Sequence, residues 1–209
     1  MTGAGAAPAS VTATVVFTDI VASTEMLARL GGDATRAVRM VHDDLIADAV
    51  AAHNGRVVKS LGDGQMLAFD AARDAIAAAI EVQQGITDHS AREPEKALEV
   101  RIGMSAGDVV WREDQGDYFG TAVVEAARLC AAAQGGEILA TELVTLLGRD
   151  AGTPTQLVGD LELKGLSSPV RTHRVQWAPR SGGAVPLPPA LISALASTTF
   201  VGRDDVRAR

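Results

Sequence analysis

The chain alternates short apolar runs, typical of β-strands, with longer stretches in which apolar residues recur at helical spacing. Strands are predicted at residues 15–17, 57–61, 66–69, 98–104, 137–140, 157–163 and 172–176. Helices are predicted at residues 23–30, 33–53, 71–86 and 120–133. Because the strands occur singly or as a hairpin between helices, the pattern predicts an α+β sandwich in which helices cover one antiparallel-rich sheet.

The amino-acid composition agrees with a folded domain and excludes several classes of function. Hydrophobic residues make up 47% of the 209 positions and charged residues 22%, which excludes a chain that is disordered throughout. Only 3% of the residues are aromatic, so the core must consist mainly of Ala, Val, Leu and Ile. A net charge of −7 argues against nucleic acid as a partner. The single cysteine, Cys130, excludes an internal disulfide, and we expect it to be a small buried apolar group.

Changes in composition predict the domain boundaries. Residues 1–10 are predicted to be a flexible N-terminus, residues 11–178 one domain, and residues 179–209 a Pro- and Gly-rich linker. Residues 200–204, FVGRD, resemble the opening of an ATPase domain that often follows such linkers in bacterial regulators, so a C-terminal ATPase domain is an expected partner. No segment approaches the roughly 20 apolar residues of a membrane-spanning helix, and signal-peptide features are missing. We therefore expect a cytoplasmic protein that does not contact a membrane.

The first candidate site is a strand that ends in an acidic residue and turns into a capped helix. Its sequence is FTDIVAST, residues 17–24, and Asp19 closes the apolar run. The N–H groups and the dipole at a helix start favour a phosphate, and an adjacent carboxylate can hold a divalent cation against that anion. The same pattern is equally consistent with Asp19 serving only as a turn cap.

The second candidate site is KSLGDG, residues 59–64, which joins the two strands of the predicted hairpin. An Asp-Gly pair at a hairpin tip usually reflects turn geometry. Together with Asp19, however, Asp63 could hold two metal ions at the ends of neighbouring strands, an arrangement that stabilises both oxygens of an in-line phosphoryl displacement. Lys59 either takes part in such a site or extends its stem into water.

The third candidate site is the predicted helix at residues 120–133 with the residues before it. Asp117 either caps this helix or contributes to a site. Val124 and Arg128 lie four residues apart on one helix face, so a molecule that binds this face contacts the guanidinium group of Arg128. An arginine on a helix lined by Ala, Val and Leu needs a partner or an exit to solvent.

Taken together, these stretches resemble the catalytic domain of the class III adenylate/guanylate cyclases, in particular the compact type of actinobacterial regulators. The matching stretches occur between residues 11 and 177 in the family's order and approximate spacing: FTDIVAST, VVKSLGDGQMLAF, LEVRIGMSAGDVV, GDYFGTAVVEAARLCAAAQGGEILAT and ELKGLSSPVRTHRV. The resemblance implies a ferredoxin-like α+β sandwich and an enzyme that cyclises a nucleoside triphosphate.

The resemblance also implies roles for individual residues. Asp19 and Asp63 match the two metal-binding aspartates, which hold two Mg²⁺ or Mn²⁺ ions per site, and Ile20 matches the residue whose backbone carbonyl binds one metal. Lys59 and Asp117 match the pair that selects adenine, since a lysine can donate to a ring nitrogen and a carboxylate can accept from the exocyclic amine. Guanine has a carbonyl in place of that amine, so ATP is the expected substrate.

The remaining matched residues are cations that contact phosphate. Arg128 matches the arginine that stabilises the transferring phosphate, Arg101 matches a basic residue that reaches the phosphates, and Lys164 lies in a similar phosphate-contacting segment. In this family the two aspartates come from one subunit, and the adenine-selecting pair and Arg128 come from the other. The resemblance therefore implies a homodimer with two equivalent sites.

One position departs from the family's pattern. Four residues before Arg128 the family usually has an asparagine that orients the ribose, whereas this chain has Val124 followed by Glu125. A valine cannot donate a hydrogen bond, and the loss of one preorganised donor costs about 100- to 1000-fold in rate. Metals, arginine and proximity remain, so weakened activity is expected. Glu125 lies about 100° further around the helix, which makes it a doubtful substitute.

Two hypotheses follow from these observations. In the first, the protein is an adenylate cyclase that converts ATP to 3′,5′-cyclic AMP and pyrophosphate. In the second, it is a cyclase-like module that dimerises or binds nucleotide without turnover and regulates the ATPase domain. The first hypothesis is favoured by five polar residues kept together in one chain, Asp19, Lys59, Asp63, Asp117 and Arg128. Val124 and the linker ending in FVGRD motivate the second.

Overall fold

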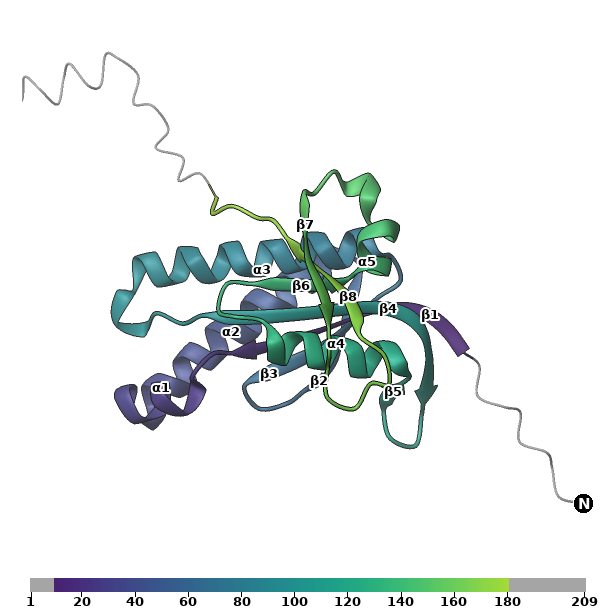
Figure 1. The fold of residues 1–209 in the computed structure, drawn as a ribbon. Helices are drawn as coiled ribbons and strands as arrows, with labels where there is room; N and C mark the ends of the chain where they lie inside the picture. Colours follow the sequence, from purple (N-terminus) through teal and green to yellow (C-terminus); the bar gives the residue numbers. More distant parts are fainter. Residues whose placement is uncertain (1–9, 181–209) are drawn as a thin grey trace, which may run out of the picture. The chain divides into compact units, whose positions relative to one another are not determined.

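A computed structural model describes residues 10–180 of the chain (Figure 1). The helices are α1 (Ser23–Leu30), α2 (Gly32–Ala52), α3 (Ala72–Arg92), η1 (Pro94–Lys96), α4 (Thr121–Ala132), α5 (Glu142–Leu147) and η2 (Arg149–Ala151). The strands are β1 (Ser10–Ile20), β2 (Gly55–Ser60), β3 (Gly64–Phe69), β4 (Val100–Arg112), β5 (Asp117–Phe119), β6 (Ile138–Thr141), β7 (Thr155–Leu161) and β8 (Val170–Val175). The predicted N-terminal segment up to residue 9, the linker after residue 180 and the ATPase-like stretch lie outside the described residues.

The strands form one mixed, eight-stranded sheet in the order β2-β3-β1-β4-β6-β8-β7, with β5 paired to β4. β1 lies antiparallel between β3 and β4, and β8 lies antiparallel between β6 and β7. β4 and β6 run parallel, which requires a crossover, and α4 lies in the connection between them. The prediction of an antiparallel-rich sheet covered by helices is therefore confirmed.

Alternate residues of β1 face two different cores. Val16 and Ile20 pack with α2 and α3 on one face of the sheet, whereas Ala13 and Val15 pack with α4 on the other. Figure 1 shows α2 and α3 behind the sheet and α4 in front of it. Within the described residues, the buried hydrophobic side chains are almost all aliphatic or methionine, with one phenylalanine and one tyrosine, as the composition predicted.

Cys130 lies in the layer formed by α4. It is 4% exposed, and burial raises the pKa of its thiol to about 12. The thiol is therefore protonated and packs as a small apolar group, in agreement with the sequence prediction.

Helix α4 packs directly against the backbone of β4 at Gly103. A Cβ at Gly103 would lie 2.0 Å from the backbone nitrogen of Cys130 and 2.4 Å from the carbonyl oxygen of Ala126. Backbone atoms cannot move aside as the end of a flexible side chain can, so only glycine permits this close approach. The glycine thereby fixes how near α4, with Val124 and Arg128, lies to the sheet.

We expect Gly103→Ala to lower the free energy of unfolding by about 3 kcal/mol, because overpacking forces α4 away from β4. Gly107→Ala is a matched control on the same strand, since its Cβ would meet only the Ala122 methyl at 3.4 Å. Urea unfolding of the two variants measures the difference. Equal stabilities would contradict the proposed role of Gly103.

The structure differs from the sequence predictions where local periodicity is weak. The helix predicted at residues 71–86 extends to Arg92, because His89 is buried and Ser90 donates a hydrogen bond to the Leu98 carbonyl over 3.1 Å. β4 extends to Arg112 instead of ending at residue 104, and β1 already begins at Ser10. The short elements α5 and β5 were not predicted, since a few residues carry too little periodic signal.

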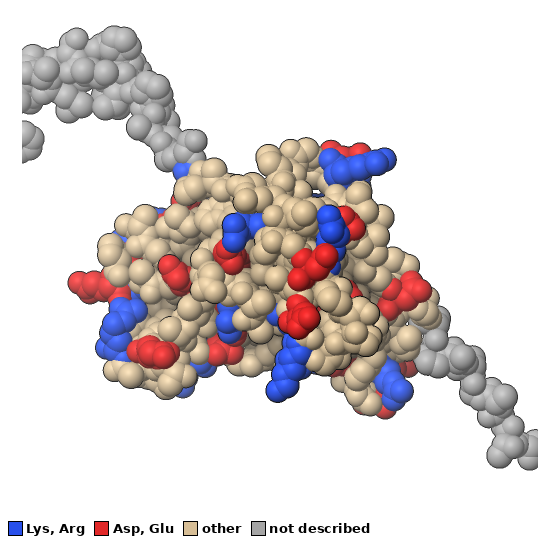
Figure 2. All heavy atoms as spheres, viewed as in Figure 1, with Lys and Arg blue, Asp and Glu red and all other residues tan. Residues whose placement is uncertain are grey.

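The surface charge of the described residues is mixed. Figure 2 shows acidic and basic side chains interspersed on the visible face, without a continuous patch of either sign. None of the helices between residues 10 and 180 is both long and apolar enough to cross a membrane.

Candidate active site

The end of β1 and the β2–β3 hairpin bring Asp19 and Asp63 together. In the antiparallel pairing of β1 and β3, Asp19 lies opposite Gly64, the residue that follows Asp63. The backbone N–H of Ile20 donates to the carbonyl oxygen of Asp63 over 2.9 Å. The two strand ends are therefore fixed side by side, which places Asp19 and Asp63 next to each other.

Asp63 is held in its ionised form. Ser23, the first residue of α1, donates its hydroxyl to the Asp63 carboxylate over 2.6 Å. This hydrogen bond is the main reason why the pKa of Asp63 lies below its usual value, and the positive charge of Arg39 contributes to the lowering. An ionised carboxylate at this place can bind a cation at neutral pH.

Arg101 contacts the other carboxylate. It lies directly opposite Asp19 in the β1–β4 pairing, and its Nε and Nη2 atoms donate to Asp19 Oδ2 over 2.8 and 2.5 Å. Its Nη1 atom donates to the carbonyl oxygen of Ala131 in α4 over 3.2 Å. The guanidinium that was expected to reach phosphate therefore lies beside Asp19, and both side chains are partly exposed.

The turn between β1 and α1 leaves the N-terminus of α1 without a side-chain cap. Ala22 adopts a left-handed conformation with φ 53° and ψ 39°, and no side chain caps the N-terminus of α1. The sequence predicted a capped helix here, but the hydroxyl of Ser23 bonds Asp63 and does not cap α1. The first N–H groups of α1 thus lack side-chain acceptors and lie next to the two carboxylates.

The chemistry of these groups fits a divalent metal. Carboxylate and carbonyl oxygens are the ligands that Mg²⁺ and Mn²⁺ prefer, and Asp19, Asp63 and the carbonyl of Ile20 provide them at the end of β1. Among residues 10–180, no group of three or more His, Cys, Asp or Glu side chains is placed to hold a metal. The remaining ligands would therefore come from phosphate oxygens and water.

Lys59 and Asp117 form an ion pair across β2 and β5, in which the Lys59 ammonium donates to Asp117 Oδ2. The other oxygen of Asp117 accepts from the Tyr118 N–H over 2.9 Å. The interpretation of Asp117 as the cap of α4 is wrong, because α4 begins at Thr121 and Asp117 opens a strand. Lys59 does not extend freely into water either, since it has a carboxylate partner.

Helix α4 presents Val124 and Arg128 outward. Both side chains are exposed, and Val124 is 39% exposed. Within residues 10–180, Arg128 makes no hydrogen bond or ion pair, so its guanidinium is available to another molecule. Glu125 is directed differently, because its carboxylate accepts a hydrogen bond from the buried Ser105 of β4 over 2.6 Å. Held against the sheet, Glu125 does not share the face of Val124 and Arg128.

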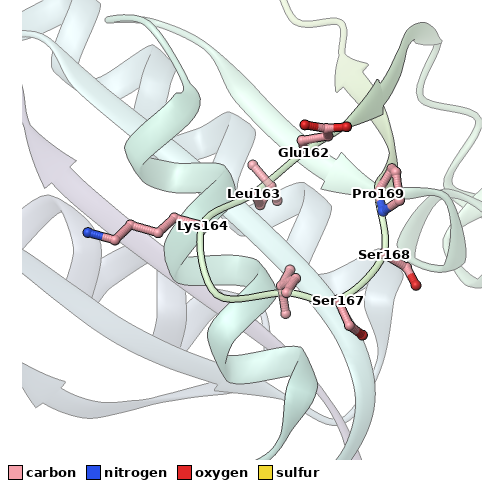
Figure 3. A pocket seen from close by; sticks show the side chains of 7 residues that line it. Glu162, Leu163, Lys164, Ser167, Ser168 and Pro169 are labelled. Carbon is pink, nitrogen blue, oxygen red and sulfur yellow. The ribbon is translucent and has the colours of Figure 1, made fainter.

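Lys164 lies in the β7–β8 loop. This loop surrounds a cavity of about 420 Å³ that is lined by Glu162, Leu163, Lys164, Leu166, Ser167, Ser168 and Pro169 (Figure 3). The Lys164 side chain points away from the cavity and is exposed. In the described part of the chain, no hydrogen bond or ion pair joins Lys164, Arg128 or the Lys59–Asp117 pair to Asp19 and Asp63. The candidate residues therefore form separate groups within one chain.

Sequence reasoning missed the polar residues of α2 that lie behind the hairpin. Arg39 acts electrostatically on Asp63, and within residues 10–180 its buried Nε atom has no hydrogen-bond partner. His42 is 1% exposed, and burial lowers the pKa of its imidazole even though Asp43, Asp19 and Asp63 act in the opposite direction. The signal that could have revealed them is a histidine on the apolar face of the predicted helix at residues 33–53.

Comparison with known proteins agrees with the fold. Residues 6–177 match the family model of the adenylate and guanylate cyclase catalytic domain. The chain therefore belongs to the adenylate/guanylate cyclase family, and its sheet and helices have the class III cyclase fold.

Similar proteins include an uncharacterized protein of Mycobacterium tuberculosis, which is 34% identical over 181 residues. That match covers 86% of this chain but only 45% of the mycobacterial protein, so the chain spans less than half of it. Among solved structures, an adenylate/guanylate cyclase/hydrolase from Silicibacter pomeroyi has 29% identity and a TM-score of 0.70, covering 80% of this chain and 97% of that one. The adenylyl cyclase CyaB from P. aeruginosa has 25% identity and a TM-score of 0.72, covering 84% and 98%.

We expect Ser23→Ala to lower the free energy of unfolding by about 1 kcal/mol at neutral pH, because it removes a hydrogen bond to a partly exposed carboxylate. The bond lowers the pKa of folded Asp63, so it stabilises the protein above the pKa that Asp63 has in the unfolded chain. The stabilisation is lost as the pH falls through the lower, folded pKa.

Urea unfolding from neutral to acidic pH measures this difference. The control is Thr24→Ala, because within the described residues the Thr24 side chain makes no hydrogen bond. A loss of stability in Ser23→Ala that stays constant down to acidic pH would contradict the assignment.

Proposed function

We propose that the protein is an adenylate cyclase that converts ATP to 3′,5′-cyclic AMP and pyrophosphate in a homodimer. The single observation that carries this proposal is the juxtaposition of Asp19 and Asp63 beside the uncapped N-terminus of α1. That place combines oxygen ligands for cations with N–H donors for a phosphate chain. The reaction belongs in the cytoplasm, which is where we expect the protein.

Asp19, Asp63 and the carbonyl of Ile20 would hold two Mg²⁺ or Mn²⁺ ions. When bound, such ions make the ribose 3′-hydroxyl more acidic and offset the charge on the α-phosphate. Ser23 supports this role, because its hydrogen bond keeps Asp63 ionised and fixes the orientation of its carboxylate. The α1 N-terminus, Arg101 and Lys164 would bind the triphosphate.

Lys59 and Asp117 would select the base. Their direct contact means that both side chains face the same space, so one purine ring can meet both. The Lys59 ammonium would donate to a ring nitrogen of adenine, and the Asp117 carboxylate would accept from the exocyclic amine. Guanine has a carbonyl oxygen in place of that amine, which the carboxylate would repel, so ATP is favoured over GTP.

A second copy of the chain would complete the site. The separate groups within one chain support this part of the proposal, since the Arg128 side chain is exposed and makes no hydrogen bond or ion pair with another described residue. Exposed apolar side chains lie on the same elements as the base-selecting residues and Arg128, among them Val57 of β2, Phe119 of β5 and Val124 of α4. A symmetric partner would cover them and supply its Arg128 to the transferring phosphate.

Val124 would weaken catalysis. It stands where the family usually has a ribose-orienting asparagine, and Glu125 is held by Ser105, so it does not replace that donor. The expected loss of about 100- to 1000-fold in rate still leaves the other groups in place. The same substitution, with the linker ending in FVGRD, motivates the second candidate function: a module that binds nucleotide without turnover and regulates a following ATPase domain.

The decisive experiment incubates the purified protein at high concentration with ATP and Mn²⁺ and measures cyclic AMP. We expect metal-dependent product, and an Asp19→Ala variant should lose about 1000-fold or more, since it removes a metal ligand. Absence of metal-dependent cyclic AMP from the unaltered protein would refute the proposal that the protein is an adenylate cyclase.

We expect Val124→Asn to raise the rate about 100-fold by restoring a donor for the ribose. Cyclic AMP formation by this variant and its ATP affinity are measured side by side. Tight ATP binding without product in both the parent and the variant would favour the nucleotide-binding module.

Exchanging both base-selecting residues, Lys59→Glu together with Asp117→Gly, should erode the preference for ATP, because both recognition groups are removed. The ratio of cyclisation rates with ATP and GTP measures this preference. An unchanged ratio would refute the assignment of the pair.

A further inference from the structure

One residue of β3, Gln65, connects this strand to α2 through its side chain and to β1, the strand that carries Asp19, through its backbone. Gln65 is 6% exposed and lies at the start of β3, two residues after Asp63. Its backbone N–H donates to the hydroxyl of Thr18, the residue before Asp19, over 3.1 Å. Its side-chain Nε2 donates to Asp43 Oδ1 on α2 over 2.7 Å. Gln65 thus joins three elements at the level of the candidate metal site.

Asp43 is the fixed end of this connection. The same Oδ1 atom lies 3.0 Å from Nδ1 of His42. Because burial lowers the pKa of His42, its imidazole is neutral at physiological pH, and the tautomer with a proton on Nδ1 donates to Asp43. Two donors on one oxygen restrict the carboxylate to one orientation, although the Asp43 side chain is 52% exposed.

The hairpin around Asp63 needs such a restraint. Asp63 lies between Gly62, which has a φ of 98°, and Gly64. Gly62 leaves the backbone on that side more freedom than another residue would allow, whereas Gly64 is paired with Asp19 and lies against the Thr18 carbonyl. A pair of carboxylates binds cations well only when their separation is fixed before the cations arrive.

We propose that Asp43 and Gln65 are positioning residues that fix the Asp63 hairpin relative to Asp19 and thereby raise the affinity for divalent cations. Neither side chain touches the reacting atoms in this scheme, because both act through the strand ends that bear Asp19 and Asp63. The role in cation binding rests on the proposed function, whereas the mechanical restraint on the hairpin does not.

Three single variants separate the hydrogen bonds from the charge. Asp43→Ala removes both the acceptor and the charge. Asp43→Asn removes the charge but keeps an acceptor oxygen for Gln65. Asp44→Ala is the matched control, because Asp44 is the exposed next residue of α2 and, among residues 10–180, makes no hydrogen bond or ion pair.

The first measurement is amide hydrogen exchange of the hairpin, residues 61–65, in the protein alone. We expect about tenfold faster exchange in Asp43→Ala, a smaller increase in Asp43→Asn, and no change in Asp44→Ala. Unchanged exchange in Asp43→Ala, or an equal increase in Asp44→Ala, would overturn the restraint whether or not the protein is a cyclase.

The second measurement is Mn²⁺ binding in the presence of an ATP analogue that cannot cyclise, followed by electron paramagnetic resonance. We expect Asp43→Ala to weaken binding about tenfold, with partial recovery in Asp43→Asn and unaltered binding in Asp44→Ala. Binding by Asp43→Ala that equals that of the parent protein would overturn the role in cation affinity. Faster exchange in Asp43→Ala together with no Mn²⁺ binding by the parent protein would refute the proposed function and leave the restraint intact.

Discussion

The register of β1 between β3 and β4 is the constraint on which the site depends. It sets Asp19 opposite Gly64 on one side and Arg101 on the other. A slip of one residue would turn Asp19 to the other face of the sheet and exchange the two sets of core residues. Since helices cover both faces, the apolar side chains of β1 permit only one register. The position of the candidate metal-binding carboxylate is thus set by the packing of valines and alanines.

The sequence predicted what local patterns encode. The spacing of apolar residues and the positions of the glycines predicted the hairpin around Gly62 and Gly64. They also predicted that Asp19 lies at the end of a strand, where the structure has it. That β1 and the hairpin are neighbours followed from the resemblance to the cyclases, because strand order leaves no trace in periodicity. The short strand at Asp117 was missed for a related reason, since three residues carry no pattern.

Polar contacts between distant elements were the part that could not be predicted. Arg101 lies on Asp19, Ser105 holds Glu125, and Gln65 reaches Asp43, yet each partner is far away in the sequence. Each contact changes how a residue is interpreted. Because Ser105 holds Glu125, this residue cannot stand in for the asparagine. Because Gln65 bonds Asp43, α2 is linked to the candidate site although no sequence motif indicates it. Such contacts follow from the assembled fold and require coordinates to be found.

The contact between Lys59 and Asp117 has a consequence for how the preference for one purine could change during evolution. Asp117 is only 17% exposed, so replacing Lys59 alone leaves a largely enclosed carboxylate without its counterion. Replacing Asp117 alone leaves an ammonium without its acceptor. Each single substitution is therefore expected to lower the free energy of unfolding by more than half of what the double substitution costs. The two positions are energetically coupled in this sense. If the pair selects the base as proposed, a lineage that changes the two residues one at a time passes through a less stable ancestor, which favours inheritance of the two substitutions as a pair.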